Sequence, residues 1–310
     1  MKSELVSLVI PLYNEEQSVH ELMRRIHESL TGHVTFEYIF VDDGSTDGSF
    51  KKLLEEKRRV KEPMTIVRFR KNSGKSMALA EGFSIVKGDV VVTLDADLQD
   101  DPAEIPHLLH VLEQGYDLVV GWKKKRHDEH DRIILSRIFN GIVSKIFHLK
   151  LHDMNCGLKV MRRQVVEEID VYGELHRFIP VLAHAKGFRV TEISVLHHPR
   201  KYGTSKFGME RIIRAPFDLL STMFLTNFRT RPLQMFGPIG TSFIGIGSMI
   251  LMYLTVLHFF GESIGRRPLL LFGILLILFG VQLFSTGLVG ELVTKMNIRK
   301  EKRPVEEVIS

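Results

Sequence analysis

The stretch VVVTLDADLQ, residues 90–99, decides the fold that the sequence predicts. Its first half is apolar and β-branched, which is typical of a strand buried on both faces of a parallel sheet. Asp95, Asp97 and Gln99 follow directly after that strand. Because ligands of open α/β sheets bind beyond the carboxyl ends of the strands, we expect the chemistry of this protein to lie there.

The alternation of strand and helix continues on both sides of this stretch. Strands are predicted over residues 5–10, 38–41, 65–69, 90–94 and 118–120, and helices over 18–30, 47–59, 75–86 and 104–113. Strand followed by helix, repeated along the chain, indicates a mostly parallel sheet with crossover helices. The front of the chain is therefore predicted to be an α/β domain.

The composition excludes some classes of protein and predicts two membrane spans. Lys and Arg total 42 and Asp and Glu 37 in 310 residues, so the net charge of +5 does not indicate a nucleic-acid partner. The single cysteine, Cys156, excludes an internal disulfide framework. Residues 232–261 and 268–290 contain no charged residue, and each exceeds the roughly 20 residues that a transmembrane helix needs. The alternative is a pair of buried helices in a soluble core.

The charges around these spans predict their orientation. Arg229 and Arg231 precede the first span and a basic run at 295–303 follows the second, whereas the connecting turn is less basic. The rule that cytoplasmic loops carry the excess of Lys and Arg places both termini in the cytosol. The N-terminus shows no signal-peptide pattern, so the α/β domain is also expected in the cytosol. We expect an integral membrane protein with both termini and the α/β domain in the cytosol.

The carboxylates after the strand at 90–94 predict a metal site. Asp95 and Asp97 have one residue between them, so their side chains can converge on one ion, and Gln99 adds a neutral oxygen. Mg²⁺ and Mn²⁺ prefer oxygen ligands and are often held by a few carboxylates together with substrate phosphates. A metal there would neutralise a diphosphate leaving group. The alternative is a solvated turn that caps the next helix.

A second acidic turn and a lysine extend the candidate site. DDGSTD, residues 42–47, also follows a strand; Gly44 suits a turn, Ser45 or Asp47 can cap the next helix, and the remaining carboxylates could hold ribose hydroxyls or a base N–H. GKS at 74–76 is not a P-loop, because position 69 is Phe where that motif needs Gly. Lys75 is either a point charge for a phosphate or a surface lysine in a first helical turn.

Several ordered motifs together resemble glycosyltransferase family 2, in the branch of dolichyl-phosphate mannose synthases and bacterial polyprenyl-phosphate glycosyltransferases. The motifs are LVIPLYNE at 8–15, VDDGSTD at 41–47, LDADLQ at 94–99, DMNCGLK at 153–159 and HPRKYGTSKF at 198–207. The resemblance covers nearly the whole chain, including the paired C-terminal spans.

The resemblance implies a GT-A fold, a Rossmann-like mostly parallel sheet, and a hexosyltransferase of cell-envelope glycan biosynthesis. The reaction would be metal-dependent, inverting transfer of a sugar from a UDP- or GDP-linked nucleotide-sugar to a membrane polyprenyl phosphate. Mg²⁺ or Mn²⁺ would serve as cofactor on Asp95, Asp97 and Gln99. The nucleotide pocket would be lined by Pro11, Tyr13, Glu15, Asp42 and, with its phosphates, Lys75.

The acceptor side is expected to be basic. A phosphate monoester has a second pKa near about 6, so it is already ionised and needs no general base. Arg132 and Ser136 are four residues apart in a predicted helical stretch, so they share one face and can grip one phosphate, as the family pattern also implies. The run 123–126 is basic too, or else a solvated loop. By resemblance, Arg200 and Lys206 flank a loop and contact phosphates.

The predicted domain organisation has four parts. Residues 1–206 form the cytosolic catalytic domain, 207–231 an amphipathic interfacial helix, 232–296 a transmembrane hairpin with spans near 235–260 and 268–290, and 297–310 a basic cytosolic tail. The expected partners are a nucleotide-sugar, a polyprenyl phosphate and the membrane, and a homo-oligomer is left open.

Two alternative functions fit parts of this pattern. A processive or non-processive polysaccharide synthase of the same superfamily would share the front domain, but the processive ones carry a Gln-x-x-Arg-Trp motif, and no such motif surrounds Trp122, the single tryptophan. A non-catalytic membrane scaffold would not need Asp95 and Asp97. The sequence does not identify the sugar or the nucleotide.

Overall fold

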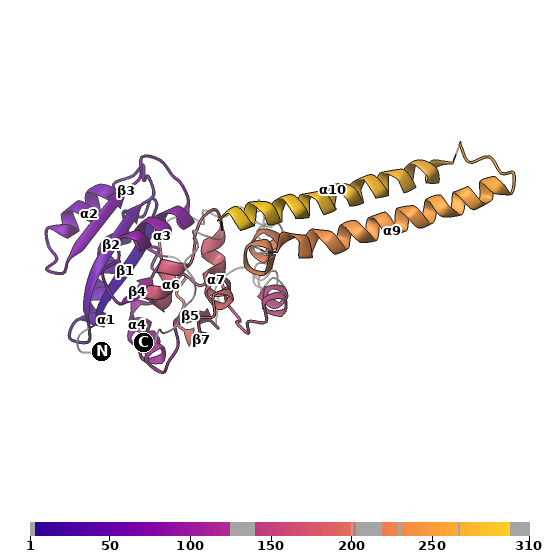
Figure 1. Ribbon diagram of the computed structural model, residues 1–310. Coiled ribbons are helices and arrows are strands. Elements are labelled where there is room, and N and C mark those ends of the chain that lie inside the picture. Colours follow the sequence, from indigo (N-terminus) through magenta and orange to yellow (C-terminus); the bar gives the residue numbers. More distant parts are fainter. Residues whose placement is uncertain are drawn as a thin grey trace. The chain divides into compact units, whose positions relative to one another are not determined.

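A computed structural model describes residues 4–124, 140–199, 201–202, 219–228, 231–265 and 267–297 (Figure 1). The chain divides into two compact units, and within the described residues the first ends at Thr222 and the second begins at Met223. The first unit contains the α/β sheet and the second contains two long apolar helices.

The first unit is built on one sheet with seven described strands. These are β1 (Leu5–Leu12), β2 (Thr35–Asp42), β3 (Met64–Arg68), β4 (Val90–Thr93), β5 (Leu118–Lys123), β6 (Lys159–Arg162) and β7 (Val190–Val195). Their order in the sheet is β3-β2-β1-β4-β6-β5-β7. The neighbours β3, β2, β1 and β4 run parallel, as do β5 and β7, whereas β6 is antiparallel to both of its neighbours.

The register brings the polar turns to one edge of the sheet. Leu12 pairs with Asp42, and Val9 pairs with Thr93, so β1, β2 and β4 end close together. The strands β1, β2 and β4 are almost entirely buried, which is why their sequences are continuous apolar runs. The five strands predicted from such runs are confirmed.

The helices of the first unit pack in two groups. They are α1 (Val19–Leu30), α2 (Ser49–Lys57), α3 (Lys75–Ser84), α4 (Ile105–Glu113), α6 (Arg163–Glu168) and α7 (Ile179–Ala185). Helix α1 packs against α2 and α4, whereas α3 packs against α6. Because crossovers between parallel strands are right-handed and the connection from β3 to β4 runs back across the sheet, α3 covers the face opposite to α1 and α2.

The second unit is a helical hairpin of α9 (Pro232–Phe259) and α10 (Pro268–Asn297). Both helices are long and apolar enough to cross a membrane, with mean hydropathies of 1.7 and 2.4. The two helices touch through glycines: a Cβ on Gly240 would lie 2.7 Å from the Gly280 carbonyl oxygen, and one on Gly247 would lie 2.7 Å from that of Gly273. Many large apolar side chains face outward along both helices.

Candidate active site

The candidate site lies at the carboxyl ends of β1, β2 and β4, where the sequence places it. Pro11 is buried near the end of β1, and Tyr13 and Glu15 in the following turn are half-buried. Asn14 has a positive φ of 52° and forms hydrogen bonds with the turn after β2. Its N–H donates to Ser45 Oγ at 2.9 Å, and its Oδ1 accepts from the Thr46 N–H at 2.8 Å. The turns after β1 and β2 therefore form one connected wall.

The turn after β2 uses its carboxylates largely on backbone groups. Asp42 is fully buried, and its Oδ1 accepts a hydrogen bond from the Ser45 N–H at 2.8 Å. Asp43 accepts from the N–H groups of Ser73 and Gly74 at 2.6 and 2.9 Å, and burial raises the pKa of its carboxyl against these two bonds. Asp43 thus fixes the start of α3.

Gly44 allows this turn to approach the chain after β3. Its φ is +71°, and a Cβ there would lie 2.4 Å from the Lys71 carbonyl carbon. The prediction that Gly44 occupies a turn is confirmed. Asp47 accepts a hydrogen bond from the N–H of Ser49, the first residue of α2, at 2.9 Å, whereas the N-cap position itself is occupied by Gly48 rather than by Ser45 or Asp47.

The turn after β4 holds the predicted metal residues Asp95, Asp97 and Gln99. Asp97 Oδ1 accepts from the Gln99 N–H at 3.2 Å, and Asp95 Oδ1 lies 2.5 Å from Lys75 Nζ at the start of α3. Lys75 therefore reaches into the site, and its partner is a carboxylate. Leu98 between the predicted ligands has a positive φ of 63°, which turns the chain sharply.

The oxygens around this turn fit a hard divalent cation. A Cβ on Gly157 would lie 2.6 Å from Asp95 Oδ2 and 2.7 Å from Asp100 Oδ2, so both oxygens point at the place that this glycine leaves free. Asp100 Oδ2 is buried and has no hydrogen-bond partner within the described residues. No group of three His, Cys, Asp or Glu side chains forms a metal site in the described ranges, and a metal here would take an amide or substrate oxygens as well.

Asp100 forms a buried ion pair that the sequence analysis missed. Its Oδ1 lies 2.8 Å from Lys123 Nζ at the end of β5 and 3.8 Å from His197 Nδ1. Burial opposes the charge on Asp100, but the nearby Lys123 ammonium outweighs it and lowers the pKa of the carboxyl. Lys123 therefore belongs neither to a free basic patch nor to a solvated loop.

Two further side chains complete this end of the sheet. Cys156 is buried, and burial raises the pKa of its thiol, which favours a packing role over a reactive one. Lys159 on β6 is also buried, and its Nζ donates to the Cys156 carbonyl oxygen. Desolvation lowers the pKa of Lys159 to about 8. A lysine in a short strand gave no signal of burial in the sequence.

Trp122, beside Lys123 on β5, stacks on an imidazole. Its ring lies 4.2 Å from that of His152 with an interplanar angle of 16°. Lys124 Nζ lies 5.7 Å from the centre of the indole. The backbone N–H of His152 donates to Glu192 Oε2 at 2.7 Å, and this hydrogen bond connects the stacked rings to β7.

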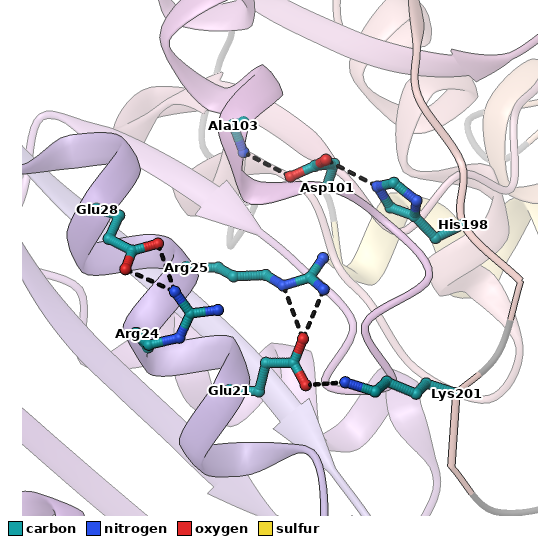
Figure 2. Close-up of polar contacts among 8 residues, drawn as sticks. All are labelled: Glu21, Arg24, Arg25, Glu28, Asp101, Ala103, His198 and Lys201. Carbon is teal, nitrogen blue, oxygen red and sulfur yellow. Dashed lines mark hydrogen bonds and ion pairs between the residues drawn. The ribbon is translucent and has the colours of Figure 1, made fainter.

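The chain after β7 runs along the turn after β4. The His198 N–H donates to the Gln99 carbonyl oxygen at 2.8 Å, and His198 Nε2 lies 2.8 Å from Asp101 Oδ2. Figure 2 shows this contact together with Lys201, whose Nζ donates to Glu21 Oε2 on α1 at 2.6 Å. His197 and His198 therefore join two parts of the site.

Four predicted site residues lie outside the described residues: Arg132, Ser136, Arg200 and Lys206. Most of the predicted interfacial helix at 207–231 lies outside them as well; its described part is helical from residue 219 to Phe228. The roles of these residues stay predictions.

Comparison with known proteins bears on the family. The model of glycosyl transferase family 2 matches residues 7–170. A dodecaprenyl-phosphate galacturonate synthase from Rhizobium johnstonii is 37% identical over 305 residues, covering 96% of this chain and 90% of that protein. An undecaprenyl-phosphate 4-deoxy-4-formamido-L-arabinose transferase from Pseudomonas savastanoi pv. phaseolicola is 37% identical over 313 residues, covering 99% and 91%.

The solved structures show the fold. Glucosyl-3-phosphoglycerate synthase from Mycobacterium tuberculosis, in complex with Mn²⁺ and uridine-diphosphate-glucose, matches with a TM-score of 0.55 and 18% identity over 72% of this chain and 79% of that one. The same enzyme in complex with Mn²⁺, uridine-diphosphate and phosphoglyceric acid gives a TM-score of 0.56. The GT-A fold that the resemblance implied is confirmed.

Proposed function

This chain belongs to glycosyltransferase family 2, and from that premise we propose that it transfers a sugar from a UDP- or GDP-linked nucleotide-sugar to a membrane polyprenyl phosphate. The product would be a polyprenyl-phosphate-sugar, formed with inversion at the anomeric carbon. The relatives named for dodecaprenyl-phosphate and undecaprenyl-phosphate products match nearly the whole chain, and this supports the acceptor class.

The observation that carries the proposal is the acidic turn after β4. Asp95, Asp97 and Gln99 would hold Mg²⁺ or Mn²⁺, and the second oxygen of Asp95, which points at the space that Gly157 leaves free, supports this assignment. Bound there, the cation would neutralise the leaving diphosphate. Lys75 is a second positive charge within reach of the same turn.

The nucleotide would lie along the wall formed by the turns after β1 and β2. Pro11 and Asp42 are buried in this wall, and Tyr13 and Glu15 are half-buried at its surface. Hydrogen bonds between the two turns hold this surface rigid, which orients the donor before the acceptor arrives.

The acceptor would attack without a general base. A phosphate monoester is largely a dianion at neutral pH, since its second pKa is about 6. The protein then has to orient that anion and stabilise charge, and we assign this task to Arg132, Ser136, Arg200 and Lys206. A sugar hydroxyl as acceptor would instead require a positioned base.

The helical hairpin would place the reaction at a membrane. Helices α9 and α10 have the length and composition of transmembrane spans. The basic residues that flank them support a cytosolic catalytic domain, with the division at residues 206, 231 and 296 that the sequence predicts.

A donor screen tests the proposal. Purified protein in detergent is incubated with Mn²⁺ or Mg²⁺, undecaprenyl phosphate and radiolabelled UDP- and GDP-sugars, and the lipid phase is counted. We expect label in the lipid phase with one donor and none after EDTA treatment. A folded protein that labels no lipid with any of these donors would contradict the proposal.

A further inference from the structure

Asp100 is a buried carboxylate that stands directly beside the proposed metal turn. The residue is 1% exposed and follows Gln99 in the chain. One of its oxygens pairs with Lys123 at 2.8 Å, and the other points at the space beside Gly157 that Asp95 also faces. Both members of the pair are largely removed from water.

The partners of Asp100 lie at the entrances to two segments that carry predicted phosphate-binding residues. Lys123 is the last residue of β5, and the chain continues from it to Arg132 and Ser136. His197 follows β7 by two residues, forms an isolated bridge with Asp100, and precedes Arg200 and Lys206. Asp100 thus joins the metal turn to both entrances.

Stability alone is a weak explanation for this pair. Taking two charges out of water costs several kcal/mol, and apolar replacements of buried ion pairs are often neutral or stabilising. The strands β5 and β7 are held together by their own backbone pairing, and Asp117 and Arg189 pair at their other end with a distance of 3.5 Å. The buried pair is therefore not needed to keep these strands together.

We propose that Asp100 and Lys123 are positioning residues. They hold the end of β5, from which the chain continues to Arg132 and Ser136, at a fixed place beside the turn of Asp95, Asp97 and Gln99. This inference deepens the proposed function and rests on it. The metal turn itself keeps other supports, because the Gln99 N–H bonds Asp97 and the Gln99 carbonyl accepts from His198. Loss of the pair should therefore impair use of the acceptor more than binding of the donor.

Steady-state kinetics in detergent with Mn²⁺ separate the two substrates. In Asp100→Asn and in Lys123→Met we expect kcat/KM for undecaprenyl phosphate to fall at least about 30-fold, because the groups that bind the acceptor are no longer held in the reactive orientation. The KM for the nucleotide-sugar should change less than about threefold. Arg189→Met removes the exposed pair at the other end of β5 and β7 and serves as the matched control. It should leave both parameters near the wild-type values.

A double variant distinguishes positioning from stability. Each single variant leaves one buried charge unpaired, so its thermal midpoint should be lowered. In the double variant Asp100→Leu with Lys123→Leu, apolar side chains replace both charges, and the thermal midpoint should be close to that of the wild type. Without a directed ion pair, kcat/KM for the acceptor should stay at least about tenfold low. Recovery of both midpoint and acceptor use would overturn the inference and leave the pair a structural one.

The outcomes also separate the inference from the proposed function. A wild-type protein that labels no lipid would remove the proposed function, and the inference with it. An active wild type whose Asp100→Asn variant uses the acceptor equally well would overturn the inference alone. Parallel losses for donor and acceptor in the folded variants would also overturn it.

Discussion

The two acidic turns of the catalytic unit use their charges differently. In residues 42–47, Asp42, Asp43 and Asp47 all accept hydrogen bonds from backbone N–H groups. In residues 95–101, Asp95 and Asp100 pair with the ammonium groups of Lys75 and Lys123. A backbone donor in a folded turn stays where it is, whereas a flexible lysine can move from a carboxylate to a ligand.

The difference indicates a division of labour within one sheet edge. The carboxylates of the first turn stabilise the turn itself and the start of α3. Each turn keeps one buried carboxylate oxygen, Asp42 Oδ2 or Asp100 Oδ2, that lacks a hydrogen bond within the described chain, but the second turn also has in Lys75 a half-buried partner that can move to a ligand. Substitution of Asp43 should therefore affect mainly stability, and substitutions in the second turn should affect turnover, whereas substitution of Asp42, which we assign to the nucleotide pocket, should affect both.

The strongest test of this division is Asp97→Ala. We expect turnover to fall by at least about 100-fold, because a group that stabilises the leaving diphosphate is lost. The free energy of unfolding should change by less than about 1 kcal/mol, as for other partly exposed positions. Sugar transfer and thermal unfolding of the same preparation check both. A variant that remains active would show that the metal assignment is wrong.

Asp43→Asn should give the opposite result. The amide keeps one acceptor oxygen but faces a backbone N–H with its NH₂ group, so at least one charge-assisted hydrogen bond is lost, at a cost of about 2 kcal/mol. Turnover per folded molecule should remain close to that of the wild type. Chemical denaturation and active-site titration measure these quantities, and a specific loss of turnover would contradict the division.

The pH dependence of stability probes the buried charges of the second turn's neighbourhood. Burial lowers the pKa of Lys159 from 10.5 to about 8 in the folded protein. Between these values the unfolded chain binds more protons, so stability should rise with pH, by about 2 to 3 kcal/mol over this window. In Lys159→Met the rise should be smaller. Thermal midpoints from pH 7.5 to 10 test this; equal slopes in both proteins would be inconsistent with a buried lysine.

The smallest effects are expected from the exposed ion pairs on α1. Glu28 contacts only Arg24 in Figure 2, whereas Glu21 also receives Lys201 from the chain after β7. Both Glu28→Gln and Glu21→Gln should cost less than about 1 kcal/mol, because exposed pairs are screened by water and salt. Glu21→Gln should have the larger effect on turnover, and kinetics of the two variants side by side decide this.

Most of the fold was predictable because the buried strands are long apolar runs. The strands β6 and β7 were not predicted. Strand β6 has four residues and is bounded by Lys159 and Arg162, and β7 is only half-buried and carries Glu192. Local pattern does not reveal that such segments pair with the rest of a sheet.

The site was predictable where its residues are consecutive. Asp95, Asp97 and Gln99 share one turn, so spacing after a strand sufficed to find them. Asp100, Lys123 and His197 meet only after β4, β5 and β7 come together, and no spacing in the chain indicates their contact. The contact of Asp43 with Ser73 and Gly74 could not be predicted either, because these partners follow a different strand.

The stack of Trp122 on His152 provides a spectroscopic reporter. The chain has one tryptophan, so its intrinsic emission comes from a single place at the end of β5, next to Lys123. The emission of an indole that stacks on an imidazole changes when the separation of the two rings changes. Fluorescence of the unlabelled protein would therefore follow movement at this strand end in real time, without an introduced dye.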